Sequence, residues 1–344
     1  MKILVLDGFA LNPGDLSWQG IRELGTLVVY DRTEPIRLLN RIGDAQVILV
    51  NKCPISRETI EACPNLKLIC VTATGYNTID LEAAKEHGVL VCNVPTYATE
   101  SVTQHVFAML LAVTNRISEH VQSVKAGDWQ KAPDFSYWKT PITEIAGMTM
   151  GIIGTGRIGM SVAKVAKAFG MQVLCYNGNH PHPEEEDDQL HFVSREELLA
   201  NADVISLHCP LTEETYHLID RASMEKMKKG VVIVNTSRGA LIDAEELLEG
   251  IKSRRIGAAC LDVYEEESEW FFRDFSGHIV EDDTLARLIS MPNVIVTSHQ
   301  AFLTEEALSN IAETTVQNLD DYFAGRALHN AVTLPDRAKR APDS

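Results

Sequence analysis

The sequence GTGRIG at residues 154–159 constrains the fold of this chain more than any other feature. A short apolar run precedes it and an Ala-rich helical pattern follows it, which is the order strand, G-x-G-x-x-G turn, helix that a dinucleotide fingerprint requires. Gly154 permits the tight turn, Gly156 lets the backbone approach a pyrophosphate, and Gly159 lets helix and strand pack closely. The free N–H groups at the helix N-terminus then face the phosphates. We therefore expect this chain to bind a nicotinamide dinucleotide.

Strands and helices alternate in two series, and 344 residues suggest about two domains. The first series ends before Pro95 and has no glycine-rich loop, and the second begins near Met148. The predicted strands are Lys2–Leu6, Thr26–Tyr30, Val47–Val50, Leu68–Val71 and Val89–Cys92, then Thr149–Ile153, Gln172–Tyr176, Val204–Leu207, Val231–Asn235, Ala258–Leu261 and Val294–Thr297. This alternation predicts two α/β units with parallel sheets.

A long amphipathic helix is predicted from Thr99 to about His120, between the two series. The stretch from Gly127 to Ile145 that follows it holds four aromatic residues, which indicates either a buried crossing or a subunit contact. A helix over Thr304–Phe323 closes the chain, and the polar tail 336–344 is expected to be mobile.

The charge and cysteine content exclude several classes of protein. A net charge of −17 and a pI of about 5.1 argue against nucleic acid and anionic membrane surfaces. No apolar run approaches the roughly 20 residues of a membrane span, and the N-terminus enters a strand pattern without a signal-peptide pattern. Seven scattered cysteines without a C-x-x-C pair predict reduced thiols in a cytoplasmic protein, and no metal site is expected.

Three predicted strands of the second series end in polar residues. Arg238 follows the strand 231–235, an acidic run from Asp262 to Glu267 follows the strand 258–261, and His299 follows the strand 294–297. The carboxyl ends of parallel strands meet at one edge of a sheet, beside the nucleotide site. An Arg can grip a carboxylate at two points, a His can transfer a proton near neutral pH, and a Glu beside the His would orient it.

These motifs make the sequence similar to the D-isomer-specific 2-hydroxyacid dehydrogenases over essentially its whole length. The motifs that carry the resemblance are GTGRIG at 154–159, HCPLT at 208–212, VNTSRG at 234–239 and LDVYE at 261–265. From Leu198 onward the chain resembles bacterial D-lactate dehydrogenases. Its first half, with Leu6-Asp7-Gly8 and Ala73–Asn77, resembles glycerate dehydrogenases, also called hydroxypyruvate reductases.

The resemblance implies two Rossmann-like domains, with the nucleotide domain inserted into a discontinuous, flavodoxin-like substrate domain. The implied boundaries are residues 1–98 and 299–335 for the substrate domain and 99–298 for the NAD(P)-binding domain.

The resemblance also implies the catalytic roles. Arg238 binds the carboxylate and the α-oxygen of the substrate, and His299 is the acid in reduction and the base in oxidation. Glu267 is the expected partner of His299, with Glu265 as the alternative within the acidic run. The implied substrate-binding residues are Thr74 and Gly75 through backbone N–H groups, Tyr97 and Phe302 at the substrate side chain, and Trp138, which reaches the pocket of a neighbouring subunit.

The implied cofactor is NAD. Its expected contacts are Val102, Gly154, Thr155, Gly156, Arg157, Ile158, Gly159, Asn177, Cys209 (through its backbone), Pro210, Thr215, Thr236, Ser237, Arg238, Asp262 and His299. Asn177 departs from the NAD pattern, because an acid usually stands there to accept hydrogen bonds from the adenosine ribose. No Arg or Lys follows as far as Pro183 to hold a 2′-phosphate, so NAD is expected ahead of NADP.

The predicted activity is the NAD(P)-dependent reduction of a small 2-oxo acid: pyruvate to D-lactate, or hydroxypyruvate or glyoxylate to D-glycerate or glycolate. The alternative is a non-catalytic, dinucleotide-sensing interaction protein of the same fold, since fold alone does not settle function. A homodimer is expected to form on the helix 99–120 and the aromatic stretch 129–145, because both carry more apolar side chains than one surface layer needs.

Overall fold

The computed structural model describes residues 1–12, 14, 16–178, 185–267 and 282–333, so the predicted tail 336–344 lies outside the described residues. The chain forms two compact units. The first comprises Met1–Tyr97 and residues 303–333, and the second comprises residues 98–267 and 282–302. Compared with the predicted boundaries, Ala98 and residues 299–302 go with the second unit.

The first unit is built on a five-stranded parallel sheet in the order β2-β1-β3-β4-β5. This is the flavodoxin-like order, in which the order of the strands across the sheet reverses between β1 and β3. The strands are β1 (Lys2–Val5), β2 (Thr26–Val29), β3 (Val47–Val50), β4 (Leu68–Val71) and β5 (Leu90–Cys92). Every residue of β3 and β4 is buried, as expected for parallel strands covered on both faces.

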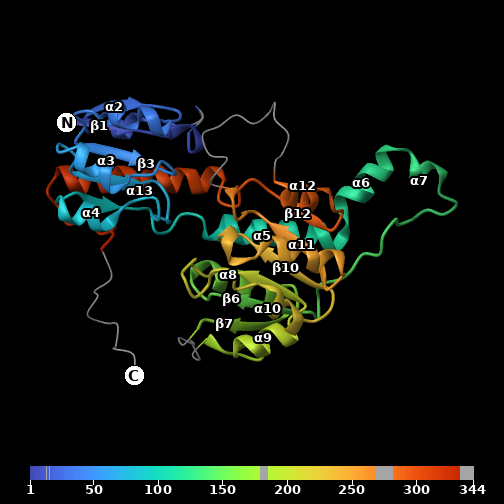
Figure 1. Cartoon of the computed structure of the whole chain (residues 1–344). Helices are drawn as coiled ribbons and strands as arrows, with labels where there is room; N and C mark the ends of the chain where they lie inside the picture. The colour runs from blue at the N-terminus through green and yellow to red at the C-terminus, as the bar shows by residue number, and fades with distance from the viewer. Residues whose placement is uncertain (13, 15, 179–184, 268–281, 334–344) are drawn as a thin grey trace, which may run out of the picture. The chain divides into compact units, whose positions relative to one another are not determined.

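Helices cover both faces of this first sheet (Figure 1). One face packs against α2 (Leu38–Ile42), α3 (Arg57–Ala62) and α4 (Leu81–Glu86). The other packs against α1 (Gln19–Arg22) and α13 (Glu305–Phe323). The last helix of the chain therefore completes the core of the first unit, which makes that unit discontinuous in sequence.

The second unit holds a seven-stranded parallel sheet in the order β12-β11-β10-β9-β6-β7-β8. Its strands are β6 (Thr149–Ile153), β7 (Gln172–Tyr176), β8 (Leu190–Phe192), β9 (Val204–Leu207), β10 (Val231–Asn235), β11 (Ile256–Leu261) and β12 (Val294–Val296). The order reverses between β6 and β9, which is the switch point where doubly wound sheets bind their ligands. The predicted fold class is confirmed, although β8 was not expected.

The helices of the second unit also lie on both faces of its sheet. One face is covered by α5 (Thr99–Asn115) and α8 (Arg157–Ala168), joined by a stacked pair of rings, Phe107 and Phe169, 5.4 Å apart. The other face is covered by α9 (Arg195–Asn201), α10 (Arg221–Lys226), α11 (Ala244–Lys252) and α12 (Asp283–Ser290).

The prediction of one long helix from Thr99 to His120 is wrong in one respect. It breaks at Arg116, which adopts a left-handed conformation (φ 53°), and continues as α6 (Ile117–Lys125) and α7 (Asp128–Lys131). These two helices and the segment 132–142 that follows them extend away from the sheet and form the α6–α7 arm (Figure 1). The buried crossing is also wrong, because Trp129, Phe135 and Trp138 are 56%, 91% and 70% exposed.

The remaining expectations concern cysteines, metals and membranes. All seven cysteines are buried free thiols. Within the described ranges no cluster of three His, Cys, Asp or Glu side chains is arranged to hold a metal ion. A search of the same residues for a helix long and apolar enough to span a bilayer finds none.

Candidate active site

The glycine turn lies where β6 meets α8, at the switch point of the second sheet. Gly154 has φ 96°, and a Cβ there would lie 2.5 Å from the backbone nitrogen of Cys209, at the end of β9. A Cβ on Gly159 would lie 2.0 Å from the carbonyl oxygen of Gly154. These two glycines therefore serve the close approach of strands and helix, as the motif predicts.

Gly156 differs from the other two glycines. A Cβ on it would meet no atom within 4 Å, and it begins α8, a helix of 12 residues, without a side-chain cap. The hydroxyls of Thr155 and Thr236 are buried without a partner among the described residues. Open space, uncapped N–H groups and two unpaired hydroxyls at one sheet edge fit the phosphates and ribose of a dinucleotide.

Asn177, which follows β7, lies at this turn. Its side-chain oxygen accepts a hydrogen bond from the backbone N–H of Thr155 at 3.3 Å. The residue that replaces the usual acid therefore contacts the glycine loop itself. Residues 179–184, which follow it closely, lie outside the described part of the chain.

Hydrogen bonds join the turns after β9 and β10 to each other, and a further bond forms within the turn after β9. The hydroxyl of Ser237 donates to the carbonyl of Cys209 at 2.8 Å, and that of Thr215 donates to the carbonyl of Pro210 at 2.7 Å. Burial raises the pKa of the Cys209 thiol to about 11, so the thiol stays protonated near neutral pH. The expectation that Cys209 contacts the cofactor through its backbone stays a prediction.

Arg238 lies at the end of β10, in a turn held by the buried Asn235. The side chain of Asn235 donates to the carbonyl of Arg238 at 2.8 Å and accepts from the N–H of Ser237 at 3.0 Å. The guanidinium of Arg238 is half-buried, donates to the carbonyl of Ser237 at 2.7 Å, and forms no ion pair with any described carboxylate. It is therefore a cation available to an anionic ligand. Sequence reasoning did not identify the role of Asn235.

The ends of β10, β11 and β12 come together as predicted. Gly239 lies against the peptide that joins Tyr264 and Glu265, where a Cβ would be 2.0 Å from the carbonyl carbon of Tyr264. His299 lies beside Glu267, with 2.8 Å between Nδ1 and Oε1. The second oxygen of Glu267 accepts from the N–H of Tyr264 at 3.3 Å. Both carboxylate oxygens of Glu267 therefore form hydrogen bonds, and Glu267 holds the imidazole of His299 through its Nδ1 atom.

Glu265 has a different partner. Its carboxylate contacts Nε2 of His217 at 2.6 Å and the hydroxyl of Tyr216 at 3.2 Å. His217 also lies 3.5 Å from Asp243, the N-cap residue of α11, whose side chain accepts a hydrogen bond from a backbone N–H of the first helical turn. Within the acidic run, the structure thus places Glu267 rather than Glu265 on His299. His217 is a hydrogen-bonded histidine of the loop after β9.

Asp262 positions the turn that carries His299. Its buried carboxylate accepts from Thr297 at 2.6 Å and from the backbone N–H groups of Gln300 and Ala301 at 2.9 and 2.8 Å. Its carbonyl accepts from the N–H of His299 at 2.7 Å, and His299 has a left-handed backbone (φ 53°). Burial alone would raise the pKa of Asp262, but these bonds and the adjacent His105 lower it. This network also explains why residues 299–302 belong to the second unit.

His105 on α5 is a site residue that the sequence did not indicate. Its Nε2 lies 3.1 Å from the hydroxyl of Thr297 and 3.5 Å from Asp262. Val102, one turn earlier on α5, is 6% exposed, and Phe302 meets the His299 ring edge-on at a centroid distance of 6.4 Å. Trp138, in contrast, lies in the exposed segment that follows α7.

Three predicted substrate residues belong to the first unit. Thr74 and Gly75 follow β4, and the backbone N–H groups of both have no acceptor among the described residues. The Thr74 hydroxyl and carbonyl are bonded to Val94 and Asn93, at 3.0 and 2.8 Å, which fixes the loop. Tyr97 is half-buried at the end of this unit.

The fold and this site define an oxidoreductase of the nicotinamide-dinucleotide class. The family model described as "D-isomer specific 2-hydroxyacid dehydrogenase, NAD binding domain" matches residues 107–301. The chain therefore belongs to the D-isomer-specific 2-hydroxyacid dehydrogenase family, whose members are NAD-dependent oxidoreductases acting on 2-hydroxy acids.

Individual relatives extend the similarity to both units. The hydroxypyruvate reductase of Blautia hydrogenotrophica is 41% identical over 94% of this chain and 98% of its own length. The D-lactate dehydrogenase of Escherichia coli is 42% identical over 77% of this chain and 78% of its own length. The structure of D-lactate dehydrogenase from Aquifex aeolicus with NAD and lactic acid is 31% identical, with a TM-score of 0.85, and covers 97% and 100% of the two chains.

Proposed function

We propose that this enzyme reduces a small 2-oxo acid, with hydroxypyruvate as the first candidate, to the D-2-hydroxy acid. The observation that carries the proposal is the contact of 2.8 Å between His299 Nδ1 and Glu267 Oε1. It leaves His299 Nε2 as the ring nitrogen without a partner among the described residues. A proton on that atom is the group that reduction of a ketone requires.

The reaction needs one hydride and one proton. When bound, NADH supplies the hydride to the carbonyl carbon and becomes NAD⁺. His299 donates its Nε2 proton to the ketone oxygen, and Glu267 stabilises the protonated ring before the transfer and keeps it oriented. In the oxidative direction the neutral ring takes the proton back from the hydroxyl group.

The substrate contacts are proposed residue by residue from the family resemblance. Arg238, which has no carboxylate partner among the described residues, would hold the substrate carboxylate at two points and contact the α-oxygen. The N–H groups of Thr74 and Gly75, which have no acceptor among the described residues, are also proposed to bind the carboxylate. Under this assignment the first unit is the substrate domain and the second the NAD-binding domain.

NAD is proposed ahead of NADP. Asn177 carries no charge that would repel a 2′-phosphate, but its oxygen is already bonded to the N–H of Thr155. Gly178, the next described residue, offers no positive charge. A ribose hydroxyl therefore suits this position better than a phosphate group.

The order of substrates follows from where the similarity lies. The relative named hydroxypyruvate reductase matches 94% of this chain, so the match includes most of the proposed substrate domain. Pyruvate is the second candidate, because the Aquifex aeolicus D-lactate dehydrogenase covers 97% of the chain in its structure with lactic acid.

The test is a panel of initial rates with hydroxypyruvate, pyruvate, glyoxylate and phenylpyruvate, each with NADH and with NADPH. The highest kcat/KM is expected for hydroxypyruvate with NADH, and His299→Ala should lower kcat by about 10²–10⁴. A maximum with pyruvate would select the second candidate. NADH binding without turnover of any 2-oxo acid would support the alternative of a non-catalytic, dinucleotide-sensing protein.

A homodimer built on the α6–α7 arm is also proposed. The apolar side chains of α5 are used in the core of the second unit, so the predicted helix 99–120 contributes less than expected. The arm instead exposes the large side chains Ile117, Val121, Val124, Trp129, Phe135, Trp138 and Ile142, each at least 44% accessible. An apolar surface of this kind indicates a protein contact. In such a dimer Trp138 is placed on the shared face.

A further inference from the structure

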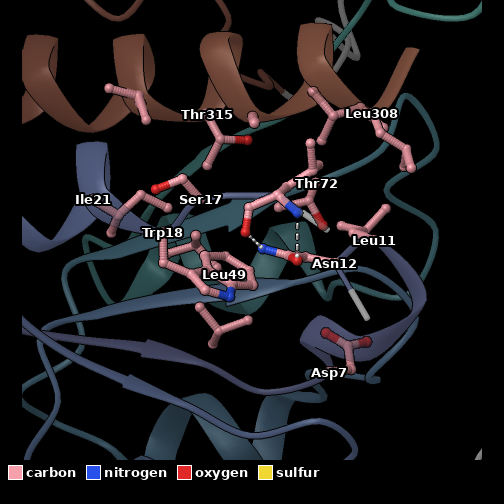
Figure 2. Close-up of a pocket in the computed structure, with 15 residues that line it drawn as sticks. Asp7, Leu11, Asn12, Ser17, Trp18, Ile21, Leu49, Thr72, Leu308 and Thr315 are labelled. Carbon is pink, nitrogen blue, oxygen red and sulfur yellow. Dashed lines mark hydrogen bonds between the residues drawn. The ribbon is translucent and has the colours of Figure 1, made fainter. Parts of the chain in front are cut away.

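The first unit contains a cavity of about 50 Å³ that is separate from the residues assigned to the reaction. It lies between α13 and the face of the sheet formed by β1 and β3, and Leu11, Asn12 and Leu16–Trp18 close one side (Figure 2). Its walls are mainly apolar, from Val5, Leu11, Leu49, Leu308 and Ile311, with the indole of Trp18 opposite the helix. A cavity with such walls binds apolar groups more favourably than water.

One buried hydroxyl in this cavity has no partner among the described residues. Thr315 on α13 is 2% exposed, and its Oγ1 is buried without a hydrogen bond, although it points toward the cavity between Leu308 and Trp18 (Figure 2). A helical Thr commonly bonds the carbonyl four residues earlier, and Thr315 does not. An unpaired buried hydroxyl destabilises the folded protein, so a ligand group that bonds it relieves this penalty.

Two other polar side chains around the cavity form hydrogen bonds. The side chain of Asn12 bonds the backbone N–H and carbonyl of Leu16 at 3.1 and 2.8 Å. The hydroxyl of Thr72 donates to the carbonyl of Val50 at 3.1 Å. Thr315 Oγ1, fully buried and without a partner among the described residues, is the hydroxyl left to orient a ligand.

The charge around the cavity selects against anions. Among the described residues its lining includes no Lys, Arg or His, and it includes the buried carboxylate of Asp7. Both oxygens of Asp7 accept backbone N–H bonds, from Asn51, Lys52 and Cys53 at 2.7–2.8 Å. Burial raises the pKa of Asp7 in spite of these bonds, so this part of the unit already disfavours negative charge. Neither a 2-oxo acid nor a 2-hydroxy acid suits the cavity.

We propose that this cavity is a binding site for a small, uncharged molecule with a branched apolar body and one hydrogen-bonding group, such as a short-chain alcohol. The apolar body contacts Leu49, Leu308 and Trp18, and the polar group bonds Thr315 Oγ1. The site is independent of the proposed function, because none of its lining residues is assigned to NAD or to the 2-oxo acid.

The experiment follows the indole N–H signal of Trp18 by NMR in the full-length protein, with Trp18→Phe to assign it. Three probes share one carbon skeleton: isobutanol, isobutyrate and isobutylammonium. Isobutanol should shift the signal and saturate in the millimolar range, as expected for so small a ligand. The two ions should not shift it at the same concentrations. No saturation with isobutanol, or equal shifts with either ion, would overturn the proposal.

Two pairs of variants on α13 test the site itself. Ala312→Leu fills the cavity and should abolish binding, whereas Ala324→Leu, just beyond the helix, should not. Thr315→Val keeps the shape but removes the hydroxyl and should weaken isobutanol binding about tenfold, whereas Thr314→Val should leave it unchanged. Thermal unfolding of each variant checks that it is folded. Unchanged binding in folded Ala312→Leu or Thr315→Val would contradict the site.

Discussion

Two histidine–glutamate pairs lie close together in the second unit, and only the tertiary structure distinguishes them. His299 pairs with Glu267 at 2.8 Å, and His217 pairs with Glu265 at 2.6 Å. The two glutamates are two residues apart in the turn after β11, yet they hold different loops. The His299–Glu267 pair is the one proposed to transfer the proton, and the His217–Glu265 pair links the loop after β9 to the start of α11.

Removing the charge of each glutamate should have different consequences. Glu267→Gln keeps the shape but removes the carboxylate that stabilises the protonated His299. A charge-assisted hydrogen bond contributes about 1.5–3 kcal/mol, so kcat for 2-oxo acid reduction should fall about 10- to 100-fold. Glu265→Gln should leave kcat within about twofold. Steady-state kinetics at pH 7 decide, and a larger loss in Glu265→Gln would reverse the assignment.

Replacing Arg238 by Lys should damage the enzyme more than the retained charge suggests. An ammonium group cannot reproduce the planar two-point grip on a carboxylate. The loss of one charged bond of about 1.5–3 kcal/mol predicts a KM for the 2-oxo acid raised about 10- to 100-fold. NADH affinity, measured by fluorescence titration, serves as the control and should change little. A normal KM in Arg238→Lys would show that Arg238 does not bind the substrate.

His208 should make the stability of the protein depend on pH. Its ring bonds Ser206 at 2.8 Å, and burial lowers its pKa from 6.5 to about 4. As the pH falls below 6.5, the unfolded chain binds the proton first, so the folded state loses stability progressively until about pH 4. The full loss is at most about 3 kcal/mol, and solvent at the partly exposed ring reduces it.

The measurement is urea unfolding between pH 7 and pH 5. His208→Gln cannot be protonated, so it should lose less stability than the wild type over this range. His191→Gln replaces an exposed histidine and should follow the wild type. If both variants lose stability in parallel with the wild type, the ring of His208 is protonated in the folded state.

At the scale of elements, the glycine turn contains two glycines that the packing requires and one, Gly156, that is proposed to bind the cofactor. Gly154 and Gly159 allow β6, β9 and α8 to approach, because a Cβ on either would lie 2.5 Å or less from backbone atoms. Gly156 has no such neighbour and a φ of −70°, so the fold does not require a glycine there. The three glycines form one sequence motif, but two of them are required by the packing of the fold and the third is not.

This difference predicts separable phenotypes. Gly156→Ala should keep the wild-type melting temperature while NADH binds at least about tenfold more weakly, because the methyl group occupies space proposed for the pyrophosphate. Gly159→Ala should lower the melting temperature, since backbone atoms must move to admit its Cβ. Calorimetry with and without NADH measures both effects. Unchanged NADH affinity in Gly156→Ala would contradict the proposal that the pyrophosphate binds at this turn.

At the scale of the whole molecule, the chain leaves a large apolar surface on the α6–α7 arm. Trp129, Phe135 and Trp138 are more than half exposed, although a tryptophan or phenylalanine normally contributes to a core or an interface. The arm extends from the sheet of the second unit, so these side chains are not used in that core (Figure 1). A second copy of the chain is the proposed occupant.

The dimer is tested by light scattering at micromolar concentration. The wild type should have twice the chain mass of 38.1 kDa, or about 76 kDa. Val121→Glu introduces a charge at a position 44% exposed on α6 and should shift the mass toward the monomer. Ile36→Glu, at a position 88% exposed in the first unit, should leave it unchanged. A wild type of about 38 kDa would contradict the proposal.

Local patterns in the sequence were sufficient for the fold class and for the set of residues proposed to act together. Parallel strands covered on both faces must be apolar runs, so β3, β4, β6, β9 and β10 have the predicted bounds. Polar residues directly after such strands must lie at one sheet edge, which is why Arg238, the acidic run 262–267 and His299 were identified. The choice of Glu267 within that run came from the family resemblance. β8 was missed because it is a three-residue edge strand, too short to show a period.

Only the tertiary structure decided what depends on packing between distant segments. The break at Arg116 depends on a left-handed backbone that a run of helical periodicity does not reveal. The partners of Glu265 and Glu267 depend on loops 48 and 32 residues away, and the cavity beneath α13 depends on a helix more than 230 residues after the strands it covers. Sequence patterns report the surroundings of a residue along the chain, whereas these features arise from close contacts between elements.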